Sequence, residues 1–409
     1  MEDKNNINKV FELRCRTIDY FGVGAIKKIS DIIKDLKENL GVDKILLVTG
    51  KRSYKVSGAW DYVKPALEEN NVEYVIYDKV SANPTVDMVD EATKLGKEFG
   101  AKAVIGIGGG SPLDTAKSVA VLLEYKDRNA RELYELKFKP TKAAPIVLIN
   151  LTHGTGTEVN RFAVATIPEK NYKPAIAFDC IYPIYSIDDP TLTIKLPPNQ
   201  TRYVTVDALN HVNEAATTIT SSPYSKLLAK EAVRLIVKYL PAVLNDPSNI
   251  TARYYLLYAS AIAGISFDNA LLHLTHALEH PISAVKPEVP HGLGLAVLMP
   301  AVVKHIYPYE AETLASIYEP LAPSLKGVPG EAEYIAKKIE EWLFNIGITQ
   351  KLSDLGFTEK DVDTLVRLAF ETPILKDLIM LAPLPFETIE KRRDVVKQIY
   401  MESLYPYNK

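Results

Sequence analysis

The stretch "VIGIGGGSPLDTAK" (104–117) has the pattern of a β-strand that runs through a glycine-rich turn into an α-helix. Gly108, Gly109 and Gly110 lack a Cβ atom, so their backbone N–H groups can approach a pyrophosphate closely. The positive end of the helix that starts near Ser111 would stabilise the phosphate charge. Many strand–helix turns carry glycines for tight packing only, and this spacing is not G-x-G-x-x-G. The stretch therefore predicts a strand–turn–helix unit and a candidate nucleotide site.

Strand-like and helical patterns alternate on both sides of this stretch, through the first 190 residues. The β-branched, apolar runs are "KILLVTG" (44–50), "VEYVIYD" (72–78), "AKAVIGIGGG" (101–110) and "APIVLINLT" (144–152). The helical patterns between them cover 24–41, 85–100 and 111–125. Such alternation predicts a parallel sheet covered by helices on both faces.

The chain changes character after "SIDDPTLTIKLPPN" (186–199), which contains three prolines. Beyond it the strand pattern nearly disappears, and helical patterns such as 225–244 and 330–347 dominate. A chain of 409 residues is also longer than one hydrophobic core usually grows. We predict an α/β dinucleotide-binding domain over residues 1–188 and an all-helical domain over residues 189–409.

A second small-residue turn, "NLTHGTGTEVN" (150–160), also follows a strand pattern. It offers the hydroxyl groups of Thr152, Thr155 and Thr157 as hydrogen-bond donors. Parallel sheets bind nucleotides at the carboxyl ends of their strands. Two such turns in one sheet therefore favour a nucleotide site over a purely structural role.

Composition excludes several classes of protein. The apolar fraction of 47% and the charged fraction of 24% are typical of a globular protein. A net charge of −3 gives no reason to expect nucleic acid or an anionic membrane as a partner. No apolar run is long enough for a membrane span, and we expect the N-terminus "MEDKNNINKV" not to be a signal peptide. The two cysteines, Cys15 and Cys180, form no CxxC motif. We therefore expect a cytoplasmic protein.

Histidine is concentrated in one short segment, because residues 273–292 contain four of the seven histidines. His273, His276 and His280 are spaced so that they can share one face of a helix. Pro281 and the segment to Pro290 are expected to end that helix. His291 follows in "PHGLG", just before another helical pattern. We therefore expect the rings to gather at one place in the helical domain.

A separate helical pattern contributes Asp207 and His211, four residues apart in "VDALNH" (206–211). One carboxylate with several neutral imidazoles is a ligand set for a first-row transition metal. The alternative is that each histidine is a satisfied core residue and that Asp207 and His211 form an intrahelical hydrogen bond. The combination on successive helices favours the metal site.

Six motifs occur together along the chain: "GIGGGSPLDTAK", "THGTGTEV", "DPTLTIKLP", "VDALNHVNEA", "AGISFDNALLHLTHALEHP" and "PHGLGLAVLMP". In this order and spacing the chain resembles the iron-containing (group III) alcohol dehydrogenase family, from about residue 20 to about residue 305. The resemblance implies the dehydroquinate-synthase-like fold of that family. It also implies hydride transfer between a nicotinamide nucleotide and a small alcohol or aldehyde.

The resemblance assigns the metal site residue by residue. It implies Asp207, His211, His276 and His291 as metal ligands, and His280 as an active-site histidine suited to relay a proton. His273 stands where the family usually has a small residue, so we expect it to pack outside the ligand set. The family name implies Fe²⁺, and the same ligands would accept Zn²⁺ or Ni²⁺.

The resemblance also bears on the choice of nucleotide. An acidic residue at the end of the second strand, where the family has one, accepts hydrogen bonds from the adenosine ribose. Here Gly50 stands in that place and is followed by Lys51, Arg52 and Ser53. Cations and a hydroxyl would suit a 2′-phosphate, so we predict NADP(H), with NAD(H) as the alternative. A solvated basic turn without this role is the structural alternative.

Further positions match residues that line the nucleotide in the family. The full set predicted to bind it is Gly50, Lys51, Ser53, Asn83, Gly108, Gly109, Gly110, Ser111, Asp114, Thr152, Thr155, Phe162 and Lys173. Asp114 has an equally good structural interpretation as an acid near the start of a helix. We also expect a homodimer or a higher homo-oligomer.

The chain departs from the family pattern at His153, which replaces a small residue near the expected nicotinamide end. Competing functions at this stage are a glycerol-dehydrogenase-like or dehydroquinate-synthase-like enzyme on the same fold, a metal-dependent hydrolase, and a nucleotide-binding protein without turnover. The full set of ligand histidines favours the alcohol dehydrogenase.

Overall fold

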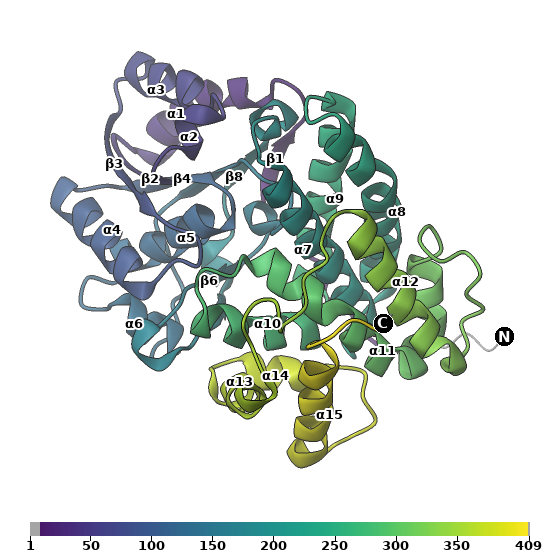
Figure 1. Ribbon diagram of the computed structural model, residues 1–409. Coiled ribbons are helices and arrows are strands. Elements are labelled where there is room, and N and C mark those ends of the chain that lie inside the picture. Colours follow the sequence, from purple (N-terminus) through teal and green to yellow (C-terminus); the bar gives the residue numbers. More distant parts are fainter. Residues whose placement is uncertain (1–8, 408–409) are drawn as a thin grey trace.

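The computed structural model describes residues 9–407. Residues 1–8 belong to the N-terminal stretch that we expect not to be a signal peptide, and they lie outside the described residues. The first half of the chain is built around a six-stranded parallel sheet in the order β1-β8-β5-β4-β2-β3 (Figure 1). The strands are β1 (Ile18–Phe21), β2 (Lys44–Gly50), β3 (Glu73–Val80), β4 (Ala103–Gly108), β5 (Ile146–Asn150) and β8 (Tyr185–Asp188). The strands all run parallel, but the order in which they are added across the sheet reverses between β2 and β4, because β3 lies on one side of this pair and β5 on the other. This switch point is where open α/β sheets bind ligands.

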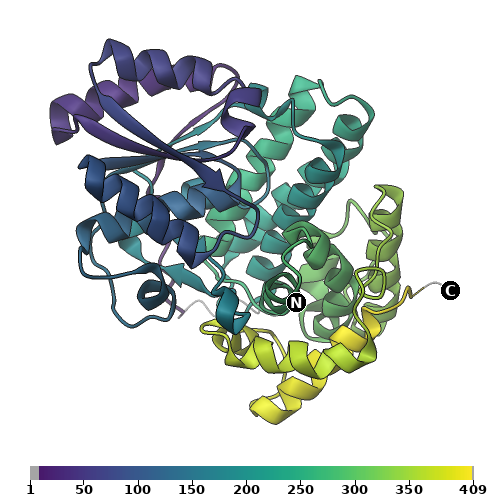
Figure 2. The ribbon, with the colours of Figure 1, turned by 60° about the vertical axis from the view of Figure 1, so that its left-hand side comes forward.

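Helices cover both faces of the sheet, with α1 (Ile29–Leu40) and α3 (Trp60–Glu69) on one face and α4 (Val86–Phe99) and α5 (Gly110–Glu124) on the other (Figure 2). Alternate residues of each strand point into the two cores. In β2, for example, Leu47 packs with α1 and α3, whereas Leu46 packs with α4 and α5. Burial on both faces explains why the strands read as continuous apolar runs.

The second half of the chain is a helical body with one large core. Its helices are α7 (Pro198–Thr217), α8 (Pro223–Asn245), α9 (Ile250–Asp268), α10 (Leu274–Val285), α11 (His291–Ile317), α12 (Ala332–Asn345), α13 (Glu359–Glu371), α14 (Leu375–Met380) and α15 (Ile389–Glu402). Within residues 9–407, no strand follows β8 and no helix is both long and apolar enough to cross a membrane.

The predicted fold class, a parallel α/β sheet followed by a helical body, is confirmed. The four predicted strands correspond to β2, β3, β4 and β5. Sequence patterns missed β1 and β8, because both are short and contain polar residues, and also the small hairpin of β6 (Phe162–Val164) and β7 (Ala175–Ala177).

The helix ends within the segment 281–290, as expected, but it does not end at Pro281 itself. Helix α10 continues through Pro281 to Val285. The missing proline N–H costs one hydrogen bond. Burial of the following residues, with Ile282 fully inside the helical core, stabilises the last turn in compensation.

A group of acidic side chains is buried where β8 meets the turn after β5. Glu158 and Asp188 are both fully buried, and neither oxygen of Glu158 has a hydrogen-bond partner among the residues that the structure describes. Burial raises the pKa of Glu158 to about 8, and nearby Asp19 adds to the rise. The folded protein therefore holds a proton that the unfolded chain releases above the ordinary pKa of glutamate, about 4.3.

Because folding raises this pKa, its contribution to stability is largest in acid and is lost as the pH rises from about 4.3 to about 8. We predict that Glu158→Gln, which resembles the protonated acid, has a wild-type melting temperature at pH 5 and a higher one at pH 8. The expected gain at pH 8 is on the order of a few kcal/mol. Thermal unfolding followed by circular dichroism at both pH values measures it.

The control is Glu340→Gln, because Glu340 is equally buried but accepts a hydrogen bond from Lys351 Nζ at 2.8 Å. That substitution should lower the melting temperature at both pH values, since it breaks a buried ion pair. A Glu158→Gln protein that is less stable than wild type at pH 8 would show that Glu158 is ionised in the folded state.

Candidate metal and nucleotide site

The predicted nucleotide turns lie side by side at the carboxyl edge of the sheet. Gly50, Gly108 and Asn150 end the neighbouring strands β2, β4 and β5. Gly109 caps α5, which begins at Gly110, one residue before the predicted start. The backbone N–H groups at this helix N-terminus face the switch point of the sheet, a favourable environment for phosphate.

The glycines are also required by packing between the two turns. A Cβ atom on Gly109 would lie 2.8 Å from Thr152 Cγ2, and one on Gly110 would lie 2.6 Å from Thr155 Cγ2. Both distances are shorter than a van der Waals contact, so side chains larger than hydrogen would force the turns apart. The packing role considered from the sequence is therefore real, and it brings Thr152 and Thr155 next to the glycine turn.

Asp114 ties α5 to the second turn through one carboxylate oxygen and to β6 through the other. It accepts hydrogen bonds from Thr157 Oγ1 at 2.7 Å and from the backbone N–H of Val164 at 3.0 Å. Lys117 Nζ, fully buried, donates to Thr157 Oγ1 and to the backbone carbonyls of Asn160 and Phe162, each at 2.8 Å. Burial raises the pKa of Asp114 to about 6 and lowers that of Lys117 to about 8. Asp114 thus has a structural role here, and the hydroxyl group of Thr157 is already hydrogen-bonded to Asp114 and Lys117.

The other predicted nucleotide residues fall into three pairs. Lys51 and Ser53 are exposed after Gly50, at the end of β2. Asn83 and Lys173 are buried together, with Lys173 Nζ donating to Asn83 Oδ1 at 2.9 Å. The last two, Ser111 and Phe162, are partly buried in α5 and β6.

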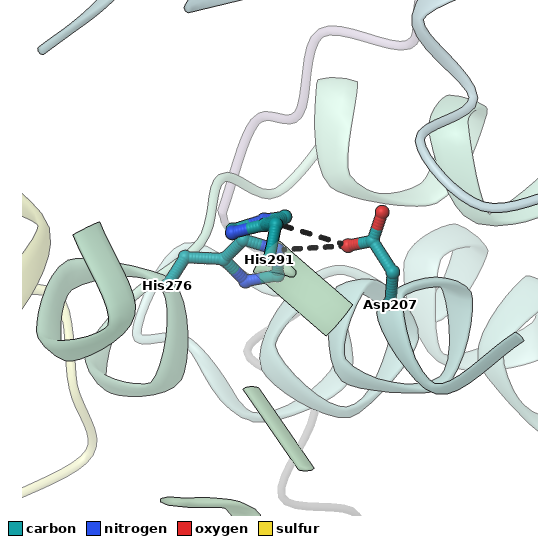
Figure 3. A group of neighbouring side chains, drawn as sticks. All are labelled: Asp207, His276 and His291. Atoms are coloured by element: carbon teal, nitrogen blue, oxygen red, sulfur yellow. Dashed lines mark hydrogen bonds and ion pairs between the residues drawn. The ribbon is translucent and has the colours of Figure 1, made fainter. Parts of the chain in front are cut away.

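Three helices bring the predicted metal ligands together. Asp207 and His211 lie on α7, His276 lies on α10, and His291 is the first residue of α11. Asp207 Oδ1 lies 3.4 Å from His276 Nε2, 3.5 Å from His211 Nε2 and 3.8 Å from His291 Nε2. Figure 3 shows the rings of His276 and His291 turned towards this carboxylate. Asp207, His276 and His291 offer donor atoms within 4.8 Å of one another, close enough to share one ion.

In each predicted ligand histidine, the Nδ1 atom contacts an oxygen acceptor. His211 Nδ1 donates to the carbonyl of Gly154 at 3.2 Å, in the turn after β5. His276 Nδ1 contacts Glu214 Oε2, and His291 Nδ1 contacts Glu279 Oε2. With Nδ1 engaged in this way, Nε2 is the atom left to bind a metal.

Sequence reasoning missed Glu214 and Glu279, although a signal was present. Each glutamate stands three residues after a ligand histidine, in "HVNE" (211–214) and "HALE" (276–279). Each contacts the ring of the next ligand along the chain rather than that of its own. Both carboxylates are fully buried, which for an acid requires a partner.

The charges of this cluster fit a divalent cation. Three carboxylates, those of Asp207, Glu214 and Glu279, face one ammonium group, that of Lys173, which lies 3.5 Å from Glu279 Oε2. Burial alone would raise the pKa of Asp207, but the neighbouring imidazoles lower it to about 2. Burial would lower the pKa of His276, but Glu214 and Asp207 raise it to about 9. The site therefore holds excess negative charge that a metal ion would neutralise.

His280 lies one turn beyond His276 on α10 and is buried. Its Nδ1 donates to the carbonyl of Lys173 at 2.6 Å, which leaves Nε2 as a proton acceptor. Burial, reinforced by Lys173, lowers the pKa of His280 well below its ordinary value. The ring centres of His280 and His291 are 5.7 Å apart, so His280 borders the cluster.

The expectation that His273 shares a helix face with His276 and His280 is wrong. His273 precedes α10 as its N-cap, and its Nδ1 accepts a hydrogen bond from the N–H of Leu274 at 2.7 Å. Its Nε2 lies 2.9 Å from Thr217 Oγ1. Both ring nitrogens are thus occupied, as expected for a residue outside the ligand set.

His153, the residue that departs from the family pattern, is buried beside α7. Its Nε2 lies 3.0 Å from Thr205 Oγ1, and Thr205 donates its own proton to the carbonyl of Thr201. His153 therefore donates through Nε2, and within residues 9–407 its Nδ1 has no partner. Burial lowers the pKa of His153 to about 3, so the ring is neutral.

Comparison with known proteins identifies the family of this chain. Residues 17–190 match the family model for iron-containing alcohol dehydrogenase, and residues 201–382 match that for the C-terminal part of the Fe-containing alcohol dehydrogenase family. The long-chain primary alcohol dehydrogenase AdhA of Thermoanaerobacter ethanolicus is 69% identical over 402 residues, which cover 98% of this chain and 99% of that protein.

More distant relatives are also alcohol dehydrogenases. The NAD-dependent methanol dehydrogenase of Bacillus methanolicus is 30% identical over 86% of this chain and 91% of that protein. The crystal structure of NADH-dependent butanol dehydrogenase A from Thermotoga maritima superposes with a TM-score of 0.85, at 30% identity, over 97% of this chain and 99% of that chain. The resemblance inferred from the motifs is confirmed: the chain belongs to the iron-containing alcohol dehydrogenase family and is an oxidoreductase that acts as an alcohol dehydrogenase.

Proposed function

We propose that this alcohol dehydrogenase transfers hydride between NADP(H) and a primary alcohol or aldehyde, with a divalent metal held by Asp207, His211, His276 and His291. The observation that supports this most is the convergence of three Nε2 atoms on Asp207 Oδ1, at 3.4 to 3.8 Å, while an acceptor engages Nδ1 of each ring. The family name favours Fe²⁺, and the donor set also suits Zn²⁺ or Ni²⁺. A metal bound here would act as a Lewis acid on the substrate oxygen.

We assign the remaining steps to side chains of this chain. Asp207 and the three imidazoles would hold the metal and orient the substrate oxygen. The two glycine turns would hold the nucleotide, with the α5 N-terminus at its pyrophosphate. His280 would pass the alcohol proton towards water through Nε2, because its Nδ1 is occupied by the carbonyl of Lys173. The division into domains at residues 188/189 and the homo-oligomeric state stay predictions.

For the substrate, we infer an extended primary alcohol or its aldehyde. The relative at 69% identity is a long-chain primary alcohol dehydrogenase. Beside His211 the chain has a small apolar cluster, separate from its three larger cores. Phe267 stacks on the His211 ring at 4.5 Å, and Phe162 and Leu272 pack against it. Phe162 and Leu272 are only partly buried, and an alkyl chain whose oxygen lies at the metal would gain free energy by packing against them.

For the cofactor, we infer NADP(H) from the turn after β2. Gly50 provides no carboxylate to repel a 2′-phosphate, and Lys51, Arg52 and Ser53 are exposed beside it. The related methanol and butanol dehydrogenases are named as NAD-dependent and NADH-dependent. The preference of this chain therefore depends on its own residues at this turn.

The first test is turnover with NADPH and a series of linear aldehydes, followed by the absorbance of the reduced cofactor. We expect reduction with kcat/KM rising with chain length, because each buried methylene contributes about 0.8 kcal/mol. His276→Ala should lose both the metal and the activity. The control is His305→Ala, since His305 contacts Glu402 outside the site and should keep both. An active His276→Ala protein with full metal content would contradict the ligand assignment.

The second test separates His280 from the ligands. We predict that His280→Ala keeps its metal but loses about 10²-fold in kcat, the usual contribution of a positioned acid–base group. Added imidazole should restore part of the rate. Metal analysis of the purified variant is decisive, because a protein that purifies without metal would make His280 a ligand.

The third test concerns the cofactor. Gly50→Asp should weaken NADPH binding by about tenfold or more, equivalent to about 1.4 kcal/mol, through repulsion of the 2′-phosphate. A Cβ atom at this position lies 3.3 Å from the Val80 carbonyl, so Gly50→Ala serves as the control for the steric part. Binding of NADPH and NADH to wild type and both variants is measured by fluorescence titration. Wild-type protein that prefers NADH by a wide margin would refute the inference.

A further inference from the structure

We propose that Glu214 is a positioning residue that ties the folding of the first turn of α10 to the orientation of the metal ligand His276. The inference rests on the proposed metal site and gives a role to a residue that the sequence analysis left without one. It concerns one carboxylate whose two oxygens make different contacts.

The first oxygen of Glu214 caps a helix. Glu214 projects from α7, and its Oε1 accepts hydrogen bonds from the backbone N–H groups of His273 at 3.1 Å, Thr275 at 2.7 Å and His276 at 3.3 Å. Helix α10 starts at Leu274, so these groups belong to the turn whose N–H donors have no partner inside the helix. A carboxylate at this end also interacts favourably with the helix dipole.

The second oxygen orients a ligand. Glu214 Oε2 contacts His276 Nδ1, so the opposite nitrogen, Nε2, points at Asp207 Oδ1, 3.4 Å away. Because both contacts belong to one rigid carboxylate, the ring of His276 can only take this orientation when the first turn of α10 is in place. The folding of this turn and the orientation of the His276 ring are therefore coupled through Glu214.

The surroundings explain why Glu214 is ionised although it is fully buried. No lysine or arginine within residues 9–407 forms an ion pair with it. Its charge is balanced by three backbone N–H groups and by His276, while the His273 ring stands 3.7 Å from Oε1. Removing such a partner from a buried ligand would leave the ligand free to rotate.

Glu214→Gln tests the proposal because the amide has the same shape. Its carbonyl can keep the three backbone donors, but the NH₂ group then faces His276 Nδ1. Two donors cannot bond, so His276 must carry its proton on Nε2, the atom that the metal needs. The alternative orientation of the amide would forfeit three hydrogen bonds to gain one.

We expect Glu214→Gln to bind Zn²⁺ about 10–100-fold more weakly than wild type, the usual effect of losing such a partner. The measurement strips the full-length protein with a chelator and titrates Zn²⁺ in competition with a metal indicator. The melting temperature of the metal-free variant should stay within a few degrees of wild type. The control is Glu340→Gln, which alters an equally buried carboxylate outside the site and should leave Zn²⁺ affinity unchanged.

A second measurement needs no variant. Hydrogen exchange of the wild-type protein, followed by mass spectrometry, should show faster exchange in the segment 273–280 after removal of Zn²⁺, with α8 unchanged. If this segment is equally protected with and without Zn²⁺, or if Glu214→Gln binds Zn²⁺ like wild type, the proposal is overturned. His276→Ala separates the two failures: normal Zn²⁺ affinity there would refute the metal site itself.

Discussion

The buried carboxylate of Asp207 is the group on which the arrangement of the helices depends. A buried charge is costly unless it is paired, and here three imidazoles face it from α7, α10 and α11. An oxygen acceptor contacts Nδ1 of each ring, and these contacts orient the ring relative to Asp207. The three helices must therefore keep their relative positions for this carboxylate to remain buried.

Contacts from the sheet side complete the same cluster. The carbonyl of Gly154, in the turn after β5, accepts from His211, and the carbonyl of Lys173 accepts from His280. Thr155 of the same turn packs against Gly110 at the start of α5. One short turn thus touches both the candidate nucleotide site and the candidate metal site. This contact explains how a sheet and a helical body can act on one substrate.

Prediction from sequence succeeded where the signal is local and periodic. The four buried strands of the sheet were readable because burial on both faces leaves continuous apolar runs. The side chains of Asp207, His211, His276 and His291 also lie close together, as their spacing led us to expect. Prediction failed at His273 and did not place the end of α10, because neighbours decide both. His273 is held outside the helix by Thr217 on α7, and Pro281 is tolerated inside α10 because Ile282 is buried.

The sequence by itself determined the α/β-then-helical order, the glycine turns and the identity of the histidines that gather at one place. Only the tertiary structure decided which acceptor orients each ring. Glu214 and Glu279 are visible in the sequence as a repeated H-x-x-E spacing, yet each contacts a ring that comes from another helix. Such pairings depend on how α7, α10 and α11 pack. Packing is set by the summed burial of many side chains rather than by the spacing of any two.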